Sequence, residues 1–241
     1  MTKGYRTSAG SKSATSKSSS DDTILDISAV KNQAESFFVK NRSFLTIGFI
    51  ALIVLVGGYL GYKYLYVDAD HKAALEQMYQ AEMLFEKDSF EMALNNPGGG
   101  FSGFKEIAEN FGHTPAGNLA KYYAGICELK LGNYDAAKSY IEDFDGKGEV
   151  MPILKYNALG DITANLLDYE AAIKHYEKAI SVRKNDFLTP WILKKLGILK
   201  ESLGDTEGAL KAYNEIKENY LGAPDGVNIE RYILNLKPEL H

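Results

Sequence analysis

The sequence has few of the side chains that usually carry chemistry. Its 241 residues include one cysteine, Cys127, and four histidines. A single cysteine excludes a disulfide within the chain, and its place in an apolar helical pattern indicates a small core residue. No paired spacing such as H-E-x-x-H is found among His71, His113, His175 and His241, which predicts surface histidines and no metal site. Because no G-x-S-x-G or nucleophile–base pair is visible, we expect no catalytic residues and no cofactor.

Glycine is not scarce, and one cluster has the spacing of a dinucleotide-binding loop. In "NNPGGGFSGF", residues 95–104, Gly98, Gly100 and Gly103 read as G-x-G-x-x-G. A dinucleotide loop follows a strand and leads into a helix that points its N-terminus at the pyrophosphate. Here the preceding "FEMAL" reads as helix, and no Gly-Lys-Ser/Thr follows. The cluster therefore predicts a loop inserted into a helical repeat, with the helix resuming in "FKEIAENF".

Charge is unevenly distributed along the chain. Residues 1–66 carry eight basic and four acidic residues, whereas residues 67–241 have a net charge of −9 within a total of −5. An acidic body has no electrostatic reason to bind a phosphate backbone. We therefore expect no nucleic-acid partner and, without a phosphate or cofactor motif, no small-molecule substrate.

Charged residues are absent from Phe44 to Tyr62, a run of nineteen residues in the printed sequence. About 20 apolar residues are needed for a helix to cross a bilayer, so we predict a transmembrane helix within residues 43–66. A buried soluble helix is disfavoured by the basic residues before the run and the tyrosines that end it. A cleaved signal peptide is disfavoured because some forty residues precede the run and no cleavage site closes it.

The flanks of the span predict its orientation. Lys40 and Arg42 precede it and acidic residues follow, so the positive-inside rule places the N-terminus in the cytoplasm and the acidic body across the membrane. In a bacterium this is a single-pass inner-membrane protein with a periplasmic C-terminal domain. Gly57 and Gly61 form G-x-x-x-G, which predicts a face for helix packing in the membrane.

Two segments precede the span. Residues 1–26 are rich in serine and almost free of apolar residues, which predicts a disordered cytoplasmic tail. Residues 27–42 carry apolar side chains at helical spacing and predict an amphipathic juxtamembrane helix. The apolar positions are Ile27, Val30, Ala34, Phe37 and Phe38.

The body, residues 67–237, repeats itself. Aligning Gly125, Gly160 and Gly197 also aligns Ala137 with Ala172 and Ala209, and successive copies are 35 and 37 residues apart. Each copy reads as two helices, with a small residue in the first that lets the second approach closely. The copies resemble the tetratricopeptide repeat, although an aromatic of its first helix and its closing proline are missing. We predict an all-α chain in which one N-terminal transmembrane helix is followed by a tetratricopeptide-repeat α-solenoid.

Two further features complete the predicted body. A divergent copy around Ala81 and Ala93 would bring the number of repeats to about four, and residues 228–237 would form a C-terminal cap helix. Because neither proline nor glycine occurs between Tyr62 and Leu94, the membrane helix is expected to continue into the first repeat helix.

A groove along the first helices of the repeats is the predicted binding surface for protein partners. An aromatic and amide-bearing groove of this kind takes an extended peptide or a partner helix. The alternative is that some members, above all Ile126 and Ile198, pack between neighbouring helices. The predicted groove residues are Tyr122, Ile126, Asn157, Asp161, Asn165, Trp191, Lys194 and Ile198.

The order of parts resembles the YfgM-type proteins, in a form associated with Bacteroidetes. The resemblance rests on "AVKNQAESFFVKNR" before the span, on "GGYLGYKYL" at its end and on "FGHTPAGNLA" in the body. It implies an ancillary subunit of the SecYEG translocon that acts beside a PpiD-like membrane chaperone and meets secreted clients. A scaffold for cell-envelope or outer-membrane protein assembly, unrelated to the translocon, is the alternative. Both readings describe a protein that is not an enzyme.

Overall fold

The computed structural model describes residues 27–236, and every regular element in that range is a helix. The predicted tail, residues 1–26, and the last predicted cap residue, Lys237, lie outside the described residues. The chain divides into two units, Met1–Leu60 and Gly61–His241. The prediction of an all-α chain is confirmed for the described range.

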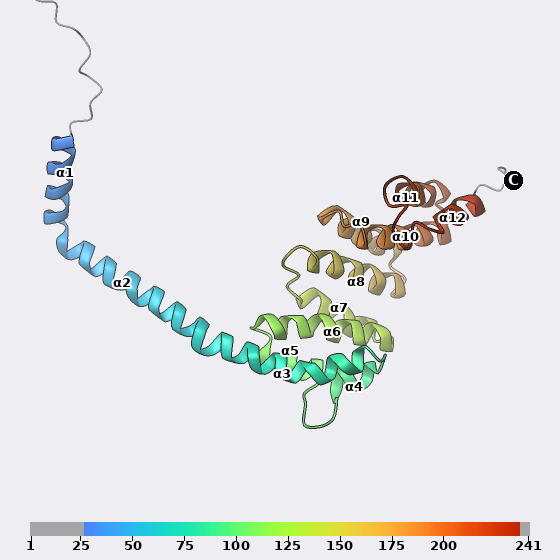
Figure 1. The fold of residues 1–241 in the computed structure, drawn as a ribbon, viewed down its shortest axis with the longest axis horizontal. Helices are drawn as coiled ribbons and strands as arrows, with labels where there is room; N and C mark the ends of the chain where they lie inside the picture. The colour runs from blue at the N-terminus through green and yellow to red at the C-terminus, as the bar shows by residue number, and fades with distance from the viewer. Residues whose placement is uncertain (1–26, 237–241) are drawn as a thin grey trace, which may run out of the picture. The chain divides into compact units, whose positions relative to one another are not determined.

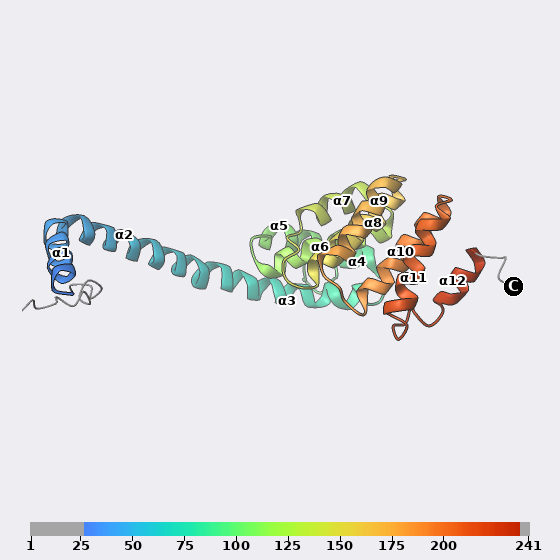
Figure 2. The same ribbon diagram turned by 90° about the horizontal axis from the view of Figure 1, so that it is seen from above.

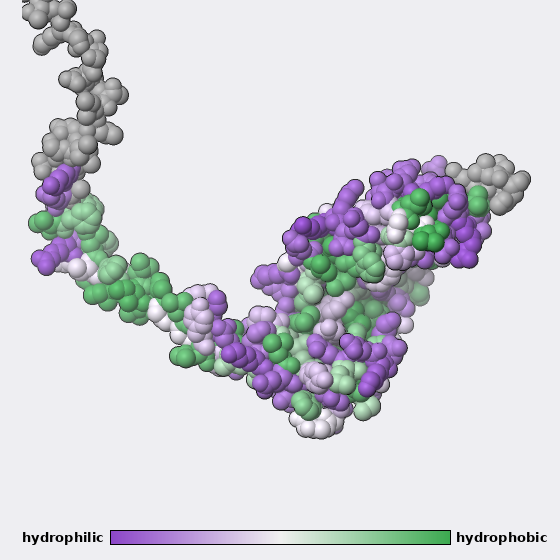
Figure 3. Space-filling model, in the orientation of Figure 1, coloured by the Kyte–Doolittle hydropathy of each residue, from purple (hydrophilic) through white to green (hydrophobic). Residues whose placement is uncertain are grey.

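The first unit contains two helices, α1 (Ile27–Lys40) and most of α2 (Arg42–Gly61). At the junction Asn41 donates both its backbone N–H and its side-chain Nδ2 to the carbonyl oxygen of Phe37, at 3.0 Å each. No residue of α2 is buried, and Phe44 is 79% exposed. Figure 3 shows apolar surface along α2. A soluble protein rarely leaves so continuous an apolar surface open to water, so α2 has the length and the surface of a membrane anchor.

Helical backbone continues without a break from Arg42 to Phe85, a stretch of 44 residues. The second unit begins with η1 (Tyr62–Val67), a π-helical segment, and α3 (Asp68–Phe85) follows it directly. This continuity is what the absence of proline and glycine predicts. The wider π turn changes which side chains share a face at the end of the apolar run.

The rest of the second unit is a row of short helices (Figures 1 and 2). Each helix from α6 onward packs against the next one in the chain. In each pair the chain runs along the first helix and comes back along the second helix, which packs beside it, as in a helical solenoid. The elements are α4 (Phe90–Asn95), α5 (Phe104–Phe111), α6 (Pro115–Leu131), α7 (Tyr134–Asp143), α8 (Met151–Asn165), α9 (Tyr169–Val182), α10 (Leu188–Ser202), α11 (Thr206–Asn219) and α12 (Ile229–Leu236).

The small residues of the repeat frame lie where two helices touch. A Cβ added to Gly160 would lie 2.5 Å from the ring of Tyr176, and one added to Gly197 would lie 2.3 Å from the ring of Tyr213. The same addition at Gly125 would meet the side chain of Ile141 at 2.6 Å. A side chain at any of the three positions would therefore force its neighbour to move, and this shared requirement is the reason the pattern could be seen in the sequence.

The glycine cluster splits the first repeat, as the sequence predicts. Helix α4 ends at Asn95 and α5 begins at Phe104. Between them Gly98, Gly99 and Gly100 all have positive φ. The loop is attached to α3 by a hydrogen bond from the Ser102 backbone N–H to Gln77 Oε1, 3.0 Å long.

The turns inside the four helix pairs share one backbone conformation. A residue with positive φ stands at the same place in each: Asp88 (55°), Gly132 (84°), Leu167 (62°) and Gly204 (79°). In each turn the next residue donates its backbone N–H to a carbonyl oxygen five residues earlier, which closes the helix C-terminus. Leu167 differs from the other three residues, because leucine has a bulky side chain and its backbone is strained at a positive φ, where glycine is preferred.

Replacing Leu167 with glycine is expected to raise the free energy of unfolding by roughly 0.5–1 kcal/mol, because the strain is relieved and little packing is lost. The side chain is 70% exposed, so it contributes little burial. Urea unfolding of the full chain in detergent measures the change. The matched control is Leu166→Gly, at a residue with negative φ that packs against the core, and it should lower stability. A Leu167→Gly protein less stable than wild type would contradict this explanation.

Candidate functional site

The predicted groove residues lie on α6, α8 and α10, the first helix of each of three successive pairs. Asn157 is buried, Asn165 and Ile198 are exposed, and the others are half-buried. Ile126 packs against the core cluster that includes Ile141 and Ile162, so it contributes to the interior as well as to the surface. Ile198 is 44% exposed and packs less tightly.

An ion pair between α8 and α10 lies at the centre of these residues. Lys195 Nζ is 2.8 Å from Asp161 Oδ1, 2.6 Å from Asp161 Oδ2 and 3.1 Å from Asn157 Oδ1. The two charged side chains are only 24% and 25% exposed. All three ammonium protons therefore have an acceptor within reach, and the pair links one repeat to the next.

Aromatic rings surround this ion pair. The Lys195 ammonium lies 3.9 Å from the ring centroid of Trp191, and the Tyr176 hydroxyl donates to Asp161 Oδ1 at 2.6 Å. Burial lowers the pKa of Lys195, against the opposing effect of Asp161. Burial, followed by the charge of Asp161, raises the pKa of Tyr176. Since the lysine is already satisfied inside the protein, it is not free to clamp a partner's carboxylate.

Tyr122, on α6, packs against the core cluster that residues of α8 help to form. Its ring lies 5.4 Å from that of Phe144, and burial, then the charge of Asp161, raises its pKa to about 12. The phenol is therefore protonated at neutral pH. With Trp191 it forms the aromatic part of the predicted groove.

Lys194 and Lys195 point to different neighbours. Lys194 Nζ donates to Asp225 Oδ1 at 3.0 Å and lies 5.3 Å from the ring centroid of Tyr232, in α12. Its hydrogen bond with Asp225 raises the pKa of Lys194.

The residue that faces Asp161 is Lys195, which the sequence prediction omitted. The missed signal was spacing: Trp191 and Lys195 are four residues apart, as are Asn157 and Asp161, so each pair shares a helix face.

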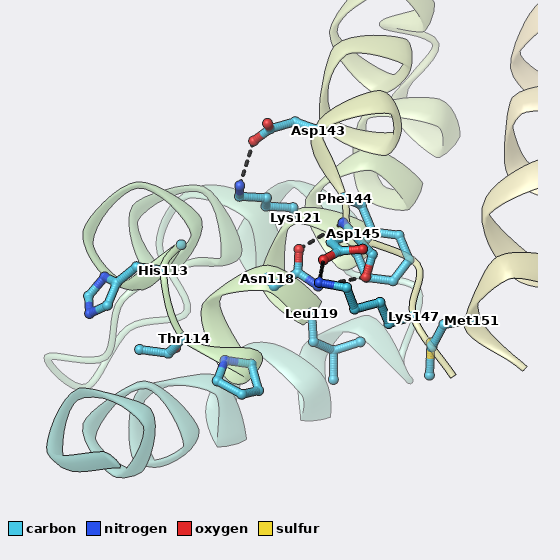
Figure 4. A pocket seen from close by; sticks show the side chains of 12 residues that line it. His113, Thr114, Asn118, Leu119, Lys121, Asp143, Phe144, Asp145, Lys147 and Met151 are labelled. Carbon is cyan, nitrogen blue, oxygen red and sulfur yellow. Dashed lines mark hydrogen bonds and ion pairs between the residues drawn. The ribbon is translucent and has the colours of Figure 1, made fainter. Parts of the chain in front are cut away.

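The "FGHTPAGNLA" run lines an open pocket of about 640 Å³ (Figure 4). The Asn118 side chain donates to the carbonyl oxygen of Asp145 and accepts from its backbone N–H, at 3.0 and 2.8 Å, and so holds the α7–α8 loop. Lys121 reaches Asp143 at 2.6 Å, and His113 Nε2 is 3.0 Å from Asp70 Oδ2. Each of these polar groups is engaged within the protein, which makes this pocket a structural junction between repeats.

Among residues 27–236, no group of three or more His, Cys, Asp and Glu side chains could hold a metal ion. Cys127 is buried, and burial followed by the charge of Glu128 raises the pKa of its thiol to about 12. It is therefore a thiol, and a poor nucleophile, at neutral pH.

Comparison with protein families agrees with the repeat geometry. The family model for the tetratricopeptide repeat matches residues 152–221, which contain nearly all of α8 to α11. This segment is a tetratricopeptide-repeat array. Neither the curated proteins nor the solved structures yield a match to the chain.

Tetratricopeptide repeats are typically non-catalytic scaffolds, and they imply protein partners for this chain. The ion pair, Trp191 and the exposed Asn165 and Ile198 belong to the matched repeats. The earlier helices α3 to α7 share the turn geometry, and their assignment to the same family stays a prediction. So does the packing role of Gly57 and Gly61, where an added Cβ would meet no described atom within 4 Å.

His175 gives the matched repeats a pH-dependent contact. Its ring stacks on that of Tyr156 with centroids 6.4 Å apart, and burial, then the charge of Lys138, lowers its pKa despite Glu142 and Asp168. In the unfolded chain histidine binds its proton near pH 6.5. The stability from the neutral ring is therefore present above that pH and lost as the pH falls towards the lower folded-state pKa.

We expect the free energy of unfolding to fall between about pH 7.5 and pH 5.5, and the fall to be smaller in His175→Phe, which keeps a ring without the proton. Urea unfolding of both proteins across this range measures the difference. Equal pH dependence in the two proteins would show that His175 does not contribute.

Proposed function

We propose that this chain is a membrane-anchored scaffold whose tetratricopeptide-repeat body binds proteins on the periplasmic side of a bacterial inner membrane. The observation that carries the proposal is that one chain joins an apolar helix with no buried residue to a tetratricopeptide-repeat array. The anchor would hold the array close to the membrane. The array would then meet partners there at a high effective concentration.

The proposed membrane partner is the SecYEG translocon, with a PpiD-like chaperone and secreted chains as the proteins that the body meets. Support for this choice comes from the resemblance to YfgM-type proteins over the runs that flank the span and over "FGHTPAGNLA". Support for the orientation comes from the basic residues Lys40 and Arg42 before the apolar run and from Asp68 and Asp70 after it.

Purification of the tagged full chain from native membranes in mild detergent tests the translocon assignment. SecY and a membrane-anchored chaperone should be enriched together with the chain. A matched chain with its span replaced by an unrelated apolar helix should keep the membrane location and lose SecY. Recovery of neither SecY nor a chaperone would overturn the assignment, and recovery of outer-membrane assembly factors would favour an envelope-assembly scaffold.

A further inference from the structure

The loops that connect one helix pair to the next lie along one edge of the second unit. At its beginning, His113 Nε2 in the α5–α6 loop is 3.0 Å from Asp70 Oδ2, and the Ala116 backbone N–H donates to His71 Nδ1 at 3.1 Å. The first turns of α3 and α6 are therefore side by side. Asn118 then joins the first turn of α6 to the α7–α8 loop (Figure 4).

The same edge continues to the end of the body. Arg183 in the α9–α10 loop is 2.8 Å from Glu149 in the α7–α8 loop. Lys194, in the second turn of α10, donates to Asp225 in the α11–α12 loop at 3.0 Å. We call this border the entry edge, because the chain enters the body there at the start of α3. Its loops are residues 112–114, 144–150, 183–187 and 220–228.

Apolar side chains are exposed in three of these four loops. Phe187 is 67% exposed, although its turn is ordered: Asn185 Oδ1 accepts the backbone N–H groups of Phe187 and of the next residue, at 3.0 and 2.8 Å. Leu221 and Val227 are 62% and 70% exposed, and Val150 is exposed as well. Single exposed apolar residues are common, but a row of them along one edge indicates an interaction surface.

The bilayer that the span would cross is close to the beginning of this edge. The uncharged run ends at Tyr62, six residues before Asp68, where α3 begins. Six residues of helix cover about 9 Å. A headgroup layer is roughly 5–8 Å deep on each side of the hydrocarbon core, so the entry edge begins at the outer limit of the headgroups. Tyr64 and Tyr66, both exposed, are of the residue type that favours this layer.

Charge neither attracts nor repels this edge strongly. Its four loops carry three basic residues and four acidic ones, 3 − 4 = −1, within a body whose net charge is −9. Attraction to a bilayer would therefore come from the apolar side chains and would not need anionic lipid. The basic residues are Lys147, Arg183 and Lys184, and the acidic ones are Asp145, Glu149, Asp186 and Asp225.

We propose that the entry edge lies on the surface of the bilayer that the chain's own span crosses, with Phe187, Leu221 and Val227 in the headgroup layer. The inference rests on the membrane anchor of the proposed function. It goes beyond that function because it gives the repeats a fixed orientation. The turns inside the helix pairs, such as the one at Leu167, then face away from the membrane.

The test uses the full chain in phosphatidylcholine nanodiscs, with a fluorophore on single introduced cysteines and a nitroxide quencher on the lipid headgroups. Labels at Phe187→Cys and Val227→Cys should lose about half of their emission, because they lie among the headgroups. A label at Leu167→Cys, equally exposed but about 20 Å away along α8, should keep its emission. Cys127 is buried, and the wild-type chain treated with the same reagent gives the background.

A second variant tests the role of the apolar side chains. Phe187→Ser with Leu221→Ser, both at exposed positions, should keep the fold and reduce quenching of the label at residue 227. The matched change Leu167→Ser should leave that quenching as it is. Unchanged quenching in the double variant would overturn the proposal.

A label at Leu52→Cys, within the apolar run, separates this inference from the anchor on which it rests. Quenching at residue 52 by a nitroxide on the lipid tails, with no more quenching at residues 187 and 227 than at 167, would overturn the inference and leave the anchor and the translocon assignment intact. Blue-shifted emission at residue 187 without lipid quenching would indicate a second copy on this edge, and would also overturn it. An unquenched label at residue 52 would overturn the anchor and this inference together.

Discussion

Replacing Asp161 with alanine should lower the free energy of unfolding by about 3 kcal/mol, because the substitution leaves a largely buried ammonium without its partner. Lys195 Nζ loses two carboxylate contacts of 2.6 and 2.8 Å and keeps only Asn157 as a polar acceptor. The Tyr176 hydroxyl loses its acceptor as well. Urea unfolding of the full chain measures the effect.

Two controls separate this effect from the loss of any surface charge. Glu170→Ala removes the partner of Lys174 in an exposed pair whose charged atoms are 4.0 Å apart, and it should cost less than about 0.5 kcal/mol. Replacing both members, Asp161→Leu with Lys195→Met, should recover most of the loss, since no buried charge is then left unpaired. An Asp161→Ala protein as stable as Glu170→Ala would show that the ion pair is not an important link between repeats.

Replacing Gly197 with alanine should lower the free energy of unfolding by about 2 kcal/mol, although alanine is the better helix former. The new Cβ would lie 2.3 Å from the Tyr213 ring. That ring has no exposed surface, and its hydroxyl donates to Glu201 Oε2 at 2.9 Å, so it cannot move aside freely. The steric cost therefore exceeds the roughly 1 kcal/mol of helix propensity that alanine gains over glycine. Thermal unfolding in the same detergent measures the shift.

A second substitution tests whether the clash with the Tyr213 ring causes the loss of stability. Tyr213→Leu alone should destabilise the protein by removing a buried ring. Combined with Gly197→Ala, it should cost less than the sum of the two single changes, because the clash is gone. Additive losses would mean that the close approach of α10 and α11 is not what requires glycine at position 197.

The sequence predicted the fold through small residues and turns. Gly125, Gly160 and Gly197 mark helix contacts at which an added side chain would have to displace its neighbour, and such contacts recur at the repeat period. The glycine loop at residues 95–104 could be assigned because its neighbours read as helix. Leu167 was not foreseen, because its turn takes the positive φ that the other repeats give to glycine or aspartate.

The details of the site were harder to predict. Lys194 and Lys195 are adjacent in sequence, yet Lys195 pairs with Asp161 on α8 and Lys194 pairs with Asp225 in the loop before α12; only the folded positions of the two carboxylates decide this.

The most direct test of the scaffold account is site-specific photocrosslinking in native membranes, with the photoreactive residue at Ile198 in the predicted groove and, as a matched exposed control, at Leu167. The account predicts that Ile198 crosslinks to a chaperone or translocon subunit, and that Asp161→Leu with Lys195→Met, which remodels the groove, reduces the yield. Crosslinks from Leu167 alone, or from Ile198 only to lipid, would contradict the claim that this groove binds the partner.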